Sequence, residues 1–256
     1  MQHKLIFDVG FHKGEDTVYY LKQGYNVVGI EANPILVDSA NKKFSKELAS
    51  KQLQLLNIGM AKEEGKLPFY INQHLSEWSS FEKALGCRMN TPFKQVEVAC
   101  KKLSTLFDEF GVPHYLKIDI EGYDSICLET IVGYNHYPRY ISCEASSPDC
   151  FDLLIQMGYT QFKLINQFRD FKALNISIEK NHLLTYLQNK KNRIKLRLQN
   201  FLPFKHIFGS SGPFGEDTDG YWYSADEIKE KYYQFFDKVS GKALNGFSWF
   251  DIHAKQ

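Results

Sequence analysis

Acidic side chains recur where apolar, strand-like segments of this sequence end. Asp8 belongs to the segment LIFDV, and Glu31 closes the segment NVVGIE. Asp119 and Glu121 follow the segment LKI in the same way. The carboxyl ends of parallel strands meet at one edge of an open α/β sheet, where such sheets bind their ligands. The pattern therefore predicts an acidic ligand site at this edge.

A glycine-bearing turn follows the first of these segments. In DVGFHKGEDT, Gly10 lets the backbone turn tightly and lets a ligand approach, and Gly14 leads the chain into the next helix. The spacing matches neither GxGxxG nor the GxxxxGK pattern of a phosphate-binding loop. The turn is therefore not predicted to bind phosphate.

The signs of the charges discriminate between cofactors. The pyrophosphate of a dinucleotide would be repelled by Asp8, Asp119 and Glu121. S-adenosylmethionine carries no phosphate, and its sulfonium and ammonium groups are attracted by carboxylates. Glu31 lies 23 positions beyond Asp8, close to the spacing at which an acidic side chain accepts hydrogen bonds from ribose hydroxyls. These residues favour S-adenosylmethionine as the cofactor.

The cofactor is expected to place its ribose on Glu31 and its adenine against Asn33, Pro34 and the turn at 57–59. Its carboxylate is expected at backbone amides of the glycine turn. The serines at 79–80 are either turn formers or further donors to that carboxylate. The predicted cofactor-binding residues are Asp8, Gly10, Gly14, Asp16, Thr17, Glu31, Ala32, Asn33, Asn57, Ile58, Gly59 and Asp119.

A sheet with covering helices must position these side chains. Up to about residue 165, short apolar runs alternate with helical patterns, which predicts an α/β fold with a parallel sheet. Period-two segments at 66–71 and 94–100 predict short antiparallel strands around a loop at 77–81. The predicted main strands are Leu5–Val9, Asn26–Glu31, Gln52–Asn57, Tyr115–Ile120, Tyr140–Glu144 and Gln161–Ile165. The predicted helices are Thr17–Lys22, Pro34–Lys46, Ser104–Phe110, Ser125–Val132 and Pro148–Met157.

The C-terminal third has a different pattern. Residues 181–215 carry six Lys or Arg residues and no acidic residue, which indicates a basic insertion. It is either a solvated helical face or mobile cover, or a lid or contact for an anionic substrate. A capping box predicts a helix over 224–236, and 248–254 is typical of a final strand. We expect a cofactor-binding core at 1–166 and a substrate cover at 167–256 that completes the same domain.

Three segments together resemble the FkbM family of S-adenosylmethionine-dependent methyltransferases. They are DVGFHKGEDTVYYLKQGYNVVGIEANP at 8–34, LKIDIEGYD at 116–124 and ISCEAS at 141–146, and the resemblance covers about residues 4–165. It implies a Rossmann-like, seven-stranded methyltransferase sheet with helices on both faces. The activity that it implies is methyl transfer to oxygen.

The resemblance also implies roles for single residues. Asp8, Gly10 and Gly14 would belong to the cofactor loop. Glu31 would bind the ribose, and Asp119 would lie at the edge where cofactor and substrate meet. Family members commonly have a small or polar residue directly after the first glycine, where this chain has Phe-His, so the shape of the pocket is left open.

A hydroxyl acceptor is a weak nucleophile, so a side chain must remove its proton while the acceptor is held in line with the methyl group. Asp119 and Glu121 are the first candidates for this base, followed by His12 and His253. His12 could instead be a solvated turn residue, and His253 a surface histidine. Alternatively, Asp119 and Glu121 could bind magnesium, with Glu144 as a third ligand. The residues favour the metal-free reading.

Three classes of function remain open. The first is an O-methyltransferase acting on a hydroxyl of a sugar, glycan or natural product. The second is a nucleotide-dependent oxidoreductase, and the third is a non-catalytic binding module. Aromatic residues at 78, 222, 223 and 249 could stack on a sugar or belong to the core.

Composition limits the partners and the location. The formal net charge is +1 over 256 residues, and no groove-reading motif occurs, so we expect no nucleic-acid partner. No apolar run approaches a membrane span and no signal peptide precedes the first strand, so we expect a cytoplasmic protein. The five cysteines show no zinc or disulfide spacing and are predicted to be buried thiols. The sequence does not predict the oligomeric state.

Overall fold

The computed structural model describes residues 4–145, 147–167, 171–174, 206, 209–237 and 249–256. It divides into two compact units, Met1–Pro138 and Arg139–Gln256, which are described separately below. Most of the basic segment 181–215 lies outside the described residues. The predicted division at residue 166 separates a cofactor core from a substrate cover by function, and it stays a prediction.

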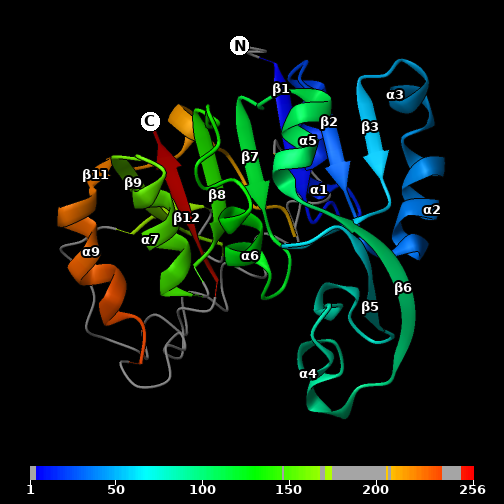
Figure 1. Ribbon diagram of the computed structural model, residues 1–256. Coiled ribbons are helices and arrows are strands. Elements are labelled where there is room, and N and C mark those ends of the chain that lie inside the picture. Colours follow the sequence, from blue (N-terminus) through cyan, green and yellow to red (C-terminus); the bar gives the residue numbers. More distant parts are fainter. Residues whose placement is uncertain (1–3, 146, 168–170, 175–205, 207–208, 238–248) are drawn as a thin grey trace. The chain divides into compact units, whose positions relative to one another are not determined.

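Four parallel strands form the sheet of the first unit (Figure 1). They are β1 (Leu5–Val9), β2 (Asn26–Ile30), β3 (Leu53–Leu56) and β7 (Tyr115–Ile118), in the order β3-β2-β1-β7. Every residue of β1 and β7 is buried, as expected for parallel strands that are covered on both faces. The predicted strands are confirmed, and three of them end one or two residues earlier than predicted.

Helices cover both faces of this sheet. The Phe7 ring contacts Phe107 on α5 (Leu103–Phe110), whereas Tyr115 contacts Tyr20 on α1 (Glu15–Lys22). Tyr115 is paired with Ile6, the neighbour of Phe7, so the two aromatic contacts lie on opposite faces. The remaining helices of the first unit's sheet are α2 (Pro34–Lys43), α3 (Ser45–Ala49) and α6 (Asp124–Glu129).

The predicted helix Pro34–Lys46 is interrupted at Phe44. Its backbone leaves the helical region (φ −106°, ψ 27°), and α3 begins at the next residue. The Phe44 side chain is buried and packs against the Phe11 ring. The Phe44 ring also lies against Gly14, so the chain changes from α2 to α3 at a residue that is anchored beneath the glycine turn.

The part of the chain that connects β3 to α5 forms a smaller sheet. Its strands are β4 (Gly59–Met60), β5 (Gly65–Asn72) and β6 (Phe93–Lys101), and β5 and β6 are antiparallel as predicted. The chain between β5 and β6, residues 73–92, is called the excursion below; Figure 1 shows it around the label α4. It contains the 3-10 turns η1 (Ser76–Trp78) and η2 (Arg88–Asn90) and the helix α4 (Lys83–Gly86).

The second unit contains a mixed sheet in the order β10-β9-β12-β8, with β11 paired to β9. The final strand β12 runs antiparallel to both β8 and β9, so β8 and β9 are parallel to each other. The predicted capping box is present at the start of α9, where Ser224 and Glu227 bond reciprocally. The elements are β8 (Tyr140–Glu144), α7 (Pro148–Gln156), β9 (Gln161–Asn166), β10 (Lys172–Ala173), η3 (Gly215–Asp217), β11 (Tyr223–Ser224), α9 (Ala225–Gln234) and β12 (Phe250–Lys255).

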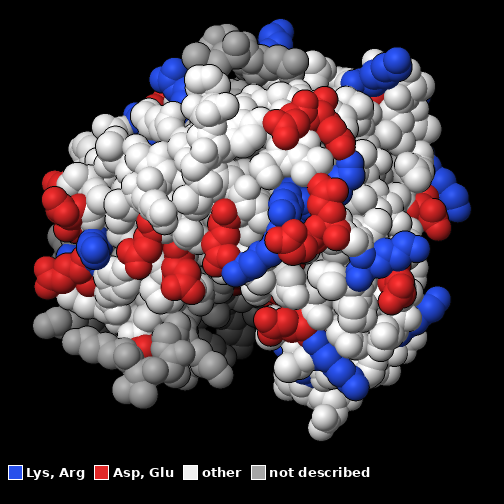
Figure 2. All heavy atoms as spheres, viewed as in Figure 1, with Lys and Arg blue, Asp and Glu red and all other residues white. Residues whose placement is uncertain are grey.

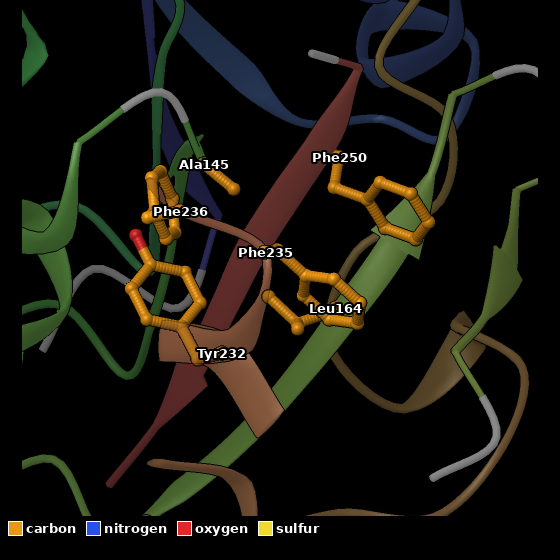
Figure 3. Close-up of a pocket in the computed structure, with 6 residues that line it drawn as sticks. All are labelled: Ala145, Leu164, Tyr232, Phe235, Phe236 and Phe250. Atoms are coloured by element: carbon orange, nitrogen blue, oxygen red, sulfur yellow. The ribbon is translucent and has the colours of Figure 1, made fainter. Parts of the chain in front are cut away.

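A small apolar cavity lies between α9 and the sheet of the second unit (Figure 3). Its lining is hydrophobic, apart from one tyrosine hydroxyl that donates to the backbone carbonyl of Ser147. A charged cofactor or a polyhydroxylated substrate requires polar partners that this lining does not provide. The lining residues are Ala145, Leu164, Tyr232, Phe235, Phe236 and Phe250.

The two units together have the α/β fold that the sequence predicts, with parallel strands and covering helices in Rossmann-like fashion. Four cysteines are buried as predicted and Cys87 is only half-buried; none of the five, all of which lie in the described part of the chain, forms a disulfide. None of the helices in the described part of the chain has the length and apolar character needed to span a bilayer.

Candidate functional site

The turn between β1 and α1 is closely packed against the end of β7. Gly10 has a left-handed backbone (φ 84°), and a Cβ atom there would lie 1.9 Å from the carbonyl oxygen of Asp119. The amides of Gly10 and Phe11 both donate to the carbonyl of Ile30, and the Gly14 amide donates to the carbonyl of Phe11. These amides are thus engaged within the tight turn itself, and the binding of the cofactor's carboxylate by amides near Gly10 and Gly14 stays a prediction.

Phe11, the departure from the family pattern, points into the core. It is 2% exposed and stacks edge-on with Phe44. Added Cβ atoms at Gly14 and Gly29 would lie 2.7 Å and 2.5 Å from its ring. Phe11 therefore fills the space beneath the turn and does not narrow the ligand side of it.

Glu31 occupies the end of β2 with both carboxylate oxygens engaged. Its Oε2 accepts a hydrogen bond from the His12 amide and its Oε1 accepts one from the Asn33 amide, both at 2.7 Å. Burial raises the pKa of Glu31 to about 7, although these two amides act in the opposite direction. Each oxygen has a further lone pair, so the carboxylate can still accept hydrogen bonds from a ligand diol.

The predicted adenine contacts lie around the same strand end. The side chain of Asn33 caps α2 by accepting from the Ile35 amide. The Asn57 amide group donates to the backbone carbonyls of residues 31–32. A Cβ atom on Gly59 would lie 2.1 Å from the Phe81 ring. The structure thus places Asn33 and Asn57 beside Glu31, where they also fix the backbone, whereas Gly59 packs against Phe81 and Cys100.

A buried lysine that sequence reasoning missed lies beneath the turn. Lys117 on β7 is 4% exposed, and its Nζ lies 3.2 Å from Asp8 Oδ1, 3.4 Å from Asp16 Oδ2 and 3.6 Å from Asp119 Oδ2. Thr17 donates a further hydrogen bond to Asp8 Oδ2 at 2.7 Å. Burial alone would lower the pKa of Lys117, but the three carboxylates raise it well above its usual value. The ammonium therefore stays charged inside the network.

This network changes how the predicted acidic residues are interpreted. Asp8 and Asp16 are buried and face Lys117, so they support the turn from below. The Asp119 side chain, by contrast, is 51% exposed and can meet a ligand. The sequence did contain a sign of this network. Lys117 stands within the apolar segment YLKI, and a lysine is almost never buried without a partner.

His12 is held by two side chains and is not a free turn residue. Its Nδ1 lies 3.1 Å from Glu15 Oε1 and its Nε2 lies 2.8 Å from the hydroxyl of Ser76 in the excursion. Its backbone is left-handed, with φ 52°. The excursion thus reaches the glycine turn through Ser76.

The excursion also reaches the turn after β7. Arg88 Nη2 lies 3.0 Å from Glu121 Oε2, and the Ser80 hydroxyl donates to the Glu121 carbonyl at 3.1 Å. The Arg88 guanidinium lies over the Trp78 ring, 4.5 Å from its centroid. The structure therefore brings His12, Asp119 and Glu121 to one edge of the first unit and adds Arg88 to them. No sequence motif indicated Arg88, because its partner lies 33 positions away.

The serines of the excursion act within the chain. The Ser79 hydroxyl accepts from the Asn72 amide, and the Ser80 hydroxyl accepts from the Glu82 amide. These contacts favour the turn-forming reading of both residues over the reading as cofactor donors.

His253 has a different environment in the second unit. It lies on β12 between Ser142 and Lys163, is 1% exposed, and its Nε2 has no hydrogen-bond partner among the described residues. The interpretation of His253 as a surface histidine is therefore wrong. Burial and the neighbouring Lys163 lower its pKa to about 3. An imidazole with this pKa is a weak general base at neutral pH.

The other aromatic residues singled out in the sequence also lie in the second unit. The ammonium nitrogens of Lys163 and Lys255 lie 4.5 Å and 5.0 Å from the centroid of the Trp222 ring. Its indole N–H donates to Glu216 at 3.0 Å. Trp249 is 48% exposed, and Tyr223 is half-buried. Trp222 is thus held by charged side chains of the second unit.

Charges elsewhere on the molecule do not form a single-sign surface. On the face shown in Figure 2, acidic and basic side chains are interspersed. Among the described residues, no group of three or more His, Cys, Asp and Glu side chains is arranged to hold a metal ion. Asp119 and Glu121, the carboxylates considered for magnesium, each contact a cationic side chain instead.

Comparison with known families agrees with the sequence resemblance. Residues 8–194 match the family model described as the methyltransferase FkbM domain, which is more than half of the chain. The chain therefore belongs to the FkbM methyltransferase family, a family of S-adenosylmethionine-dependent enzymes. No functionally curated protein matches the sequence.

Solved methyltransferase structures show a distant likeness. An FkbM methyltransferase from Methylobacillus flagellatus is 13% identical, with 56% of this chain and 32% of that chain covered and a TM-score of 0.37. A TehB-like S-adenosylmethionine-dependent methyltransferase from Corynebacterium glutamicum is 15% identical, with 70% and 77% covered and a TM-score of 0.37. The C-terminal domain of a precorrin-6Y C5,15-methyltransferase from Rhodobacter capsulatus is 12% identical, with 65% and 68% covered and a TM-score of 0.38. This chain thus spans about a third of the Methylobacillus protein.

Proposed function

We propose that this protein transfers a methyl group from S-adenosylmethionine to a hydroxyl of a sugar, glycan or natural product. The observation that carries the proposal is the buried Glu31 carboxylate at the end of β2, beside the glycine turn. Family membership supports the cofactor class, and the carboxylate supplies acceptors for a ribose diol.

The residues fit this cofactor in charge and in the hydrogen bonds that they can accept. Glu31 offers acceptors at the strand end where a ribose is expected, and Asn33 and Asn57 hold the adjoining backbone in place. The half-exposed Asp119 would face the cationic end of the cofactor. When bound, the cofactor supplies an electrophilic methyl group on a sulfonium.

The protein's own contribution to the reaction would be positioning and proton removal. An acceptor hydroxyl must be held in line with the reacting carbon, and a base must take its proton as the bond forms. Asp119 and Glu121 lie at the same edge, and both have partly exposed side chains. We assign the base to this pair, with His12 as the next candidate because Glu15 and Ser76 orient its ring.

Calorimetry with S-adenosylhomocysteine tests the cofactor assignment. The wild-type protein should bind it and should not bind NAD. Glu31→Gln should weaken binding at pH 8 by about tenfold to a hundredfold, since hydrogen bonds to a charged acceptor contribute about 1.5–3 kcal/mol. Glu63→Gln changes a glutamate that is 85% exposed between β4 and β5; it is the matched control and should bind normally. Preferential binding of NAD would refute the assignment.

A methyl-transfer assay tests the reaction. The protein would be incubated with radiolabelled S-adenosylmethionine and a panel of hydroxyl acceptors, including methyl glycosides and phenols, with and without EDTA. Transfer to a hydroxyl that is lost in Asp119→Asn and unchanged by EDTA supports the proposal. Transfer only to nitrogen or carbon acceptors would refute the O-methyl assignment.

A further inference from the structure

Glu121 is held by an arginine that comes from a distant part of the chain. Arg88 Nη2 lies 3.0 Å from Glu121 Oε2, and the two side chains are 29% and 31% exposed. The ion pair is thus partly shielded, a setting in which charges interact more strongly than on an open surface. The second link, from the Ser80 hydroxyl to the Glu121 carbonyl, fixes the backbone of the same residue.

The Arg88 side chain has a second constraint. Its guanidinium lies over the face of Trp78, 4.5 Å from the ring centroid. A planar cation stacked on an indole loses little further freedom when it pairs with a carboxylate. Arg88 is therefore oriented toward Glu121 before any ligand binds.

Backbone strain marks both ends of this ion pair. Glu121 has φ 28°, and Met89 and Asn90, which follow Arg88, have φ 58° and 55°. Left-handed backbone at residues other than glycine costs on the order of 1–3 kcal/mol and persists only where surrounding contacts enforce it. His12 has φ 52°. Of the six non-glycine residues with left-handed backbone in the described chain, four therefore lie in the glycine turn, in the excursion or in the turn after β7. Such clustering is typical of functional sites.

We propose that Arg88 is a positioning residue that holds the Glu121 carboxylate ionised and aimed at the acceptor hydroxyl. The inference rests on the proposed function, because it assigns Arg88 a task only if Glu121 takes part in proton removal. Arg88 itself need not touch the substrate. The excursion then has a defined role, which is to deliver this guanidinium to the turn after β7.

The charges around Glu121 determine how its pKa would change if Arg88 were removed. The pKa of Glu121 lies above its usual value because burial, Asp119 and Glu77 raise it, and the Arg88 guanidinium opposes this rise. Among these groups Arg88 is the cation, and the two carboxylates come from the same turn and from η1. Removal of Arg88 would therefore leave Glu121 protonated up to a higher pH, and a protonated carboxyl cannot act as a base.

The test measures the titration of Glu121 directly. Side-chain carboxyl 13C signals of labelled glutamate would be followed against pH in the wild type and in Arg88→Met, with Glu121→Gln used to assign the signal. The midpoint should rise by about 1–3 pH units in Arg88→Met, the usual effect of losing an opposite charge at this range. Arg88→Lys keeps the charge and should restore most of the midpoint even if Arg88→Met folds poorly. Lys83→Met removes a neighbouring exposed cation of the excursion and should leave the midpoint unchanged.

Two further readouts separate positioning from a structural role. The affinity for S-adenosylhomocysteine should be the same in the wild type and in Arg88→Met. With an acceptor from the methyl-transfer panel, the acid limb of the kcat profile should move upward together with the 13C midpoint. An unmoved midpoint and an unmoved acid limb in a folded Arg88→Met protein overturn the role of Arg88. A wild type that transfers the methyl group only to nitrogen or carbon acceptors overturns the proposed function, and the inference falls with it.

Discussion

The pKa of Glu31 predicts that cofactor affinity depends on pH in a defined window. The carboxyl titrates near pH 7 in the free protein because it is buried. A ribose diol donates hydrogen bonds to the ionised form, so binding requires the proton to leave. The ionised fraction falls from about 90% at pH 8 to about 3% at pH 5.5, so the Kd should rise about 30-fold over that range, equivalent to about 2 kcal/mol.

Calorimetric titration with S-adenosylhomocysteine at half-unit steps of pH measures this dependence directly. The proton released on binding should also appear as a dependence of the binding enthalpy on the ionisation enthalpy of the buffer. Glu31→Gln cannot ionise, so it should bind more weakly at pH 8 and show a flat profile. It also reveals any titration of the ligand itself. A wild-type Kd that varies less than threefold between pH 8 and 5.5 would refute the reasoning.

Three further changes test other parts of the structure. Lys117→Met removes the cation that the buried carboxylates share and should lower the free energy of unfolding by about 3–5 kcal/mol in urea titrations, whereas the exposed control Lys42→Met should change it by less than about 0.5 kcal/mol. The added methyl group of Gly10→Ala would meet a backbone oxygen, so this variant should lose binding of S-adenosylhomocysteine or unfold. Gly24 has the same left-handed backbone but open space around it, so Gly24→Ala should lower the free energy of unfolding by only about 1–2 kcal/mol. Equal damage by the two substitutions would contradict the steric argument. His253 has its pKa lowered to about 3, so the unfolded chain binds a proton that the native state does not, and the wild type should lose about 2 kcal/mol between pH 6.5 and 5. His253→Gln should lack this loss in urea titrations at the two pH values, and an identical loss in the variant would contradict the prediction.

Much of the fold could be predicted because local patterns and tertiary structure agree. The segments Leu5–Val9 and Tyr140–Glu144 are strands at the predicted bounds, since each is a short apolar run between turns. The capping box at Ser224 depends only on residues three positions apart and is present as predicted. The break at Phe44 was not predicted, because residues 37, 40 and 44 are apolar and buried at helical spacing and the local pattern therefore indicates a continuous helix.

The site was predictable to a similar extent and for similar reasons. Acidic residues at strand ends could be placed at one edge by the rule for parallel sheets, and Glu31 and Asp119 do lie beside the glycine turn. The Lys117 network and the Arg88 ion pair depend on contacts between distant segments. Hydrophobic period and residue spacing carry no information on such contacts, and so the ligand site was predicted to be more acidic than it is in the structure.

The excursion contacts two different loops at the edge of the parallel sheet. Ser76 contacts His12 in the glycine turn, and Arg88 pairs with Glu121 in the loop after β7. An attempt to alter acceptor preference by grafting residues 73–92 from a relative would therefore disturb the glycine turn and the loop after β7 at once. A graft that carries its own matched residues at positions 12 and 121 avoids this conflict. For protein engineering, the exchangeable module is this discontinuous set of segments and not the loop alone.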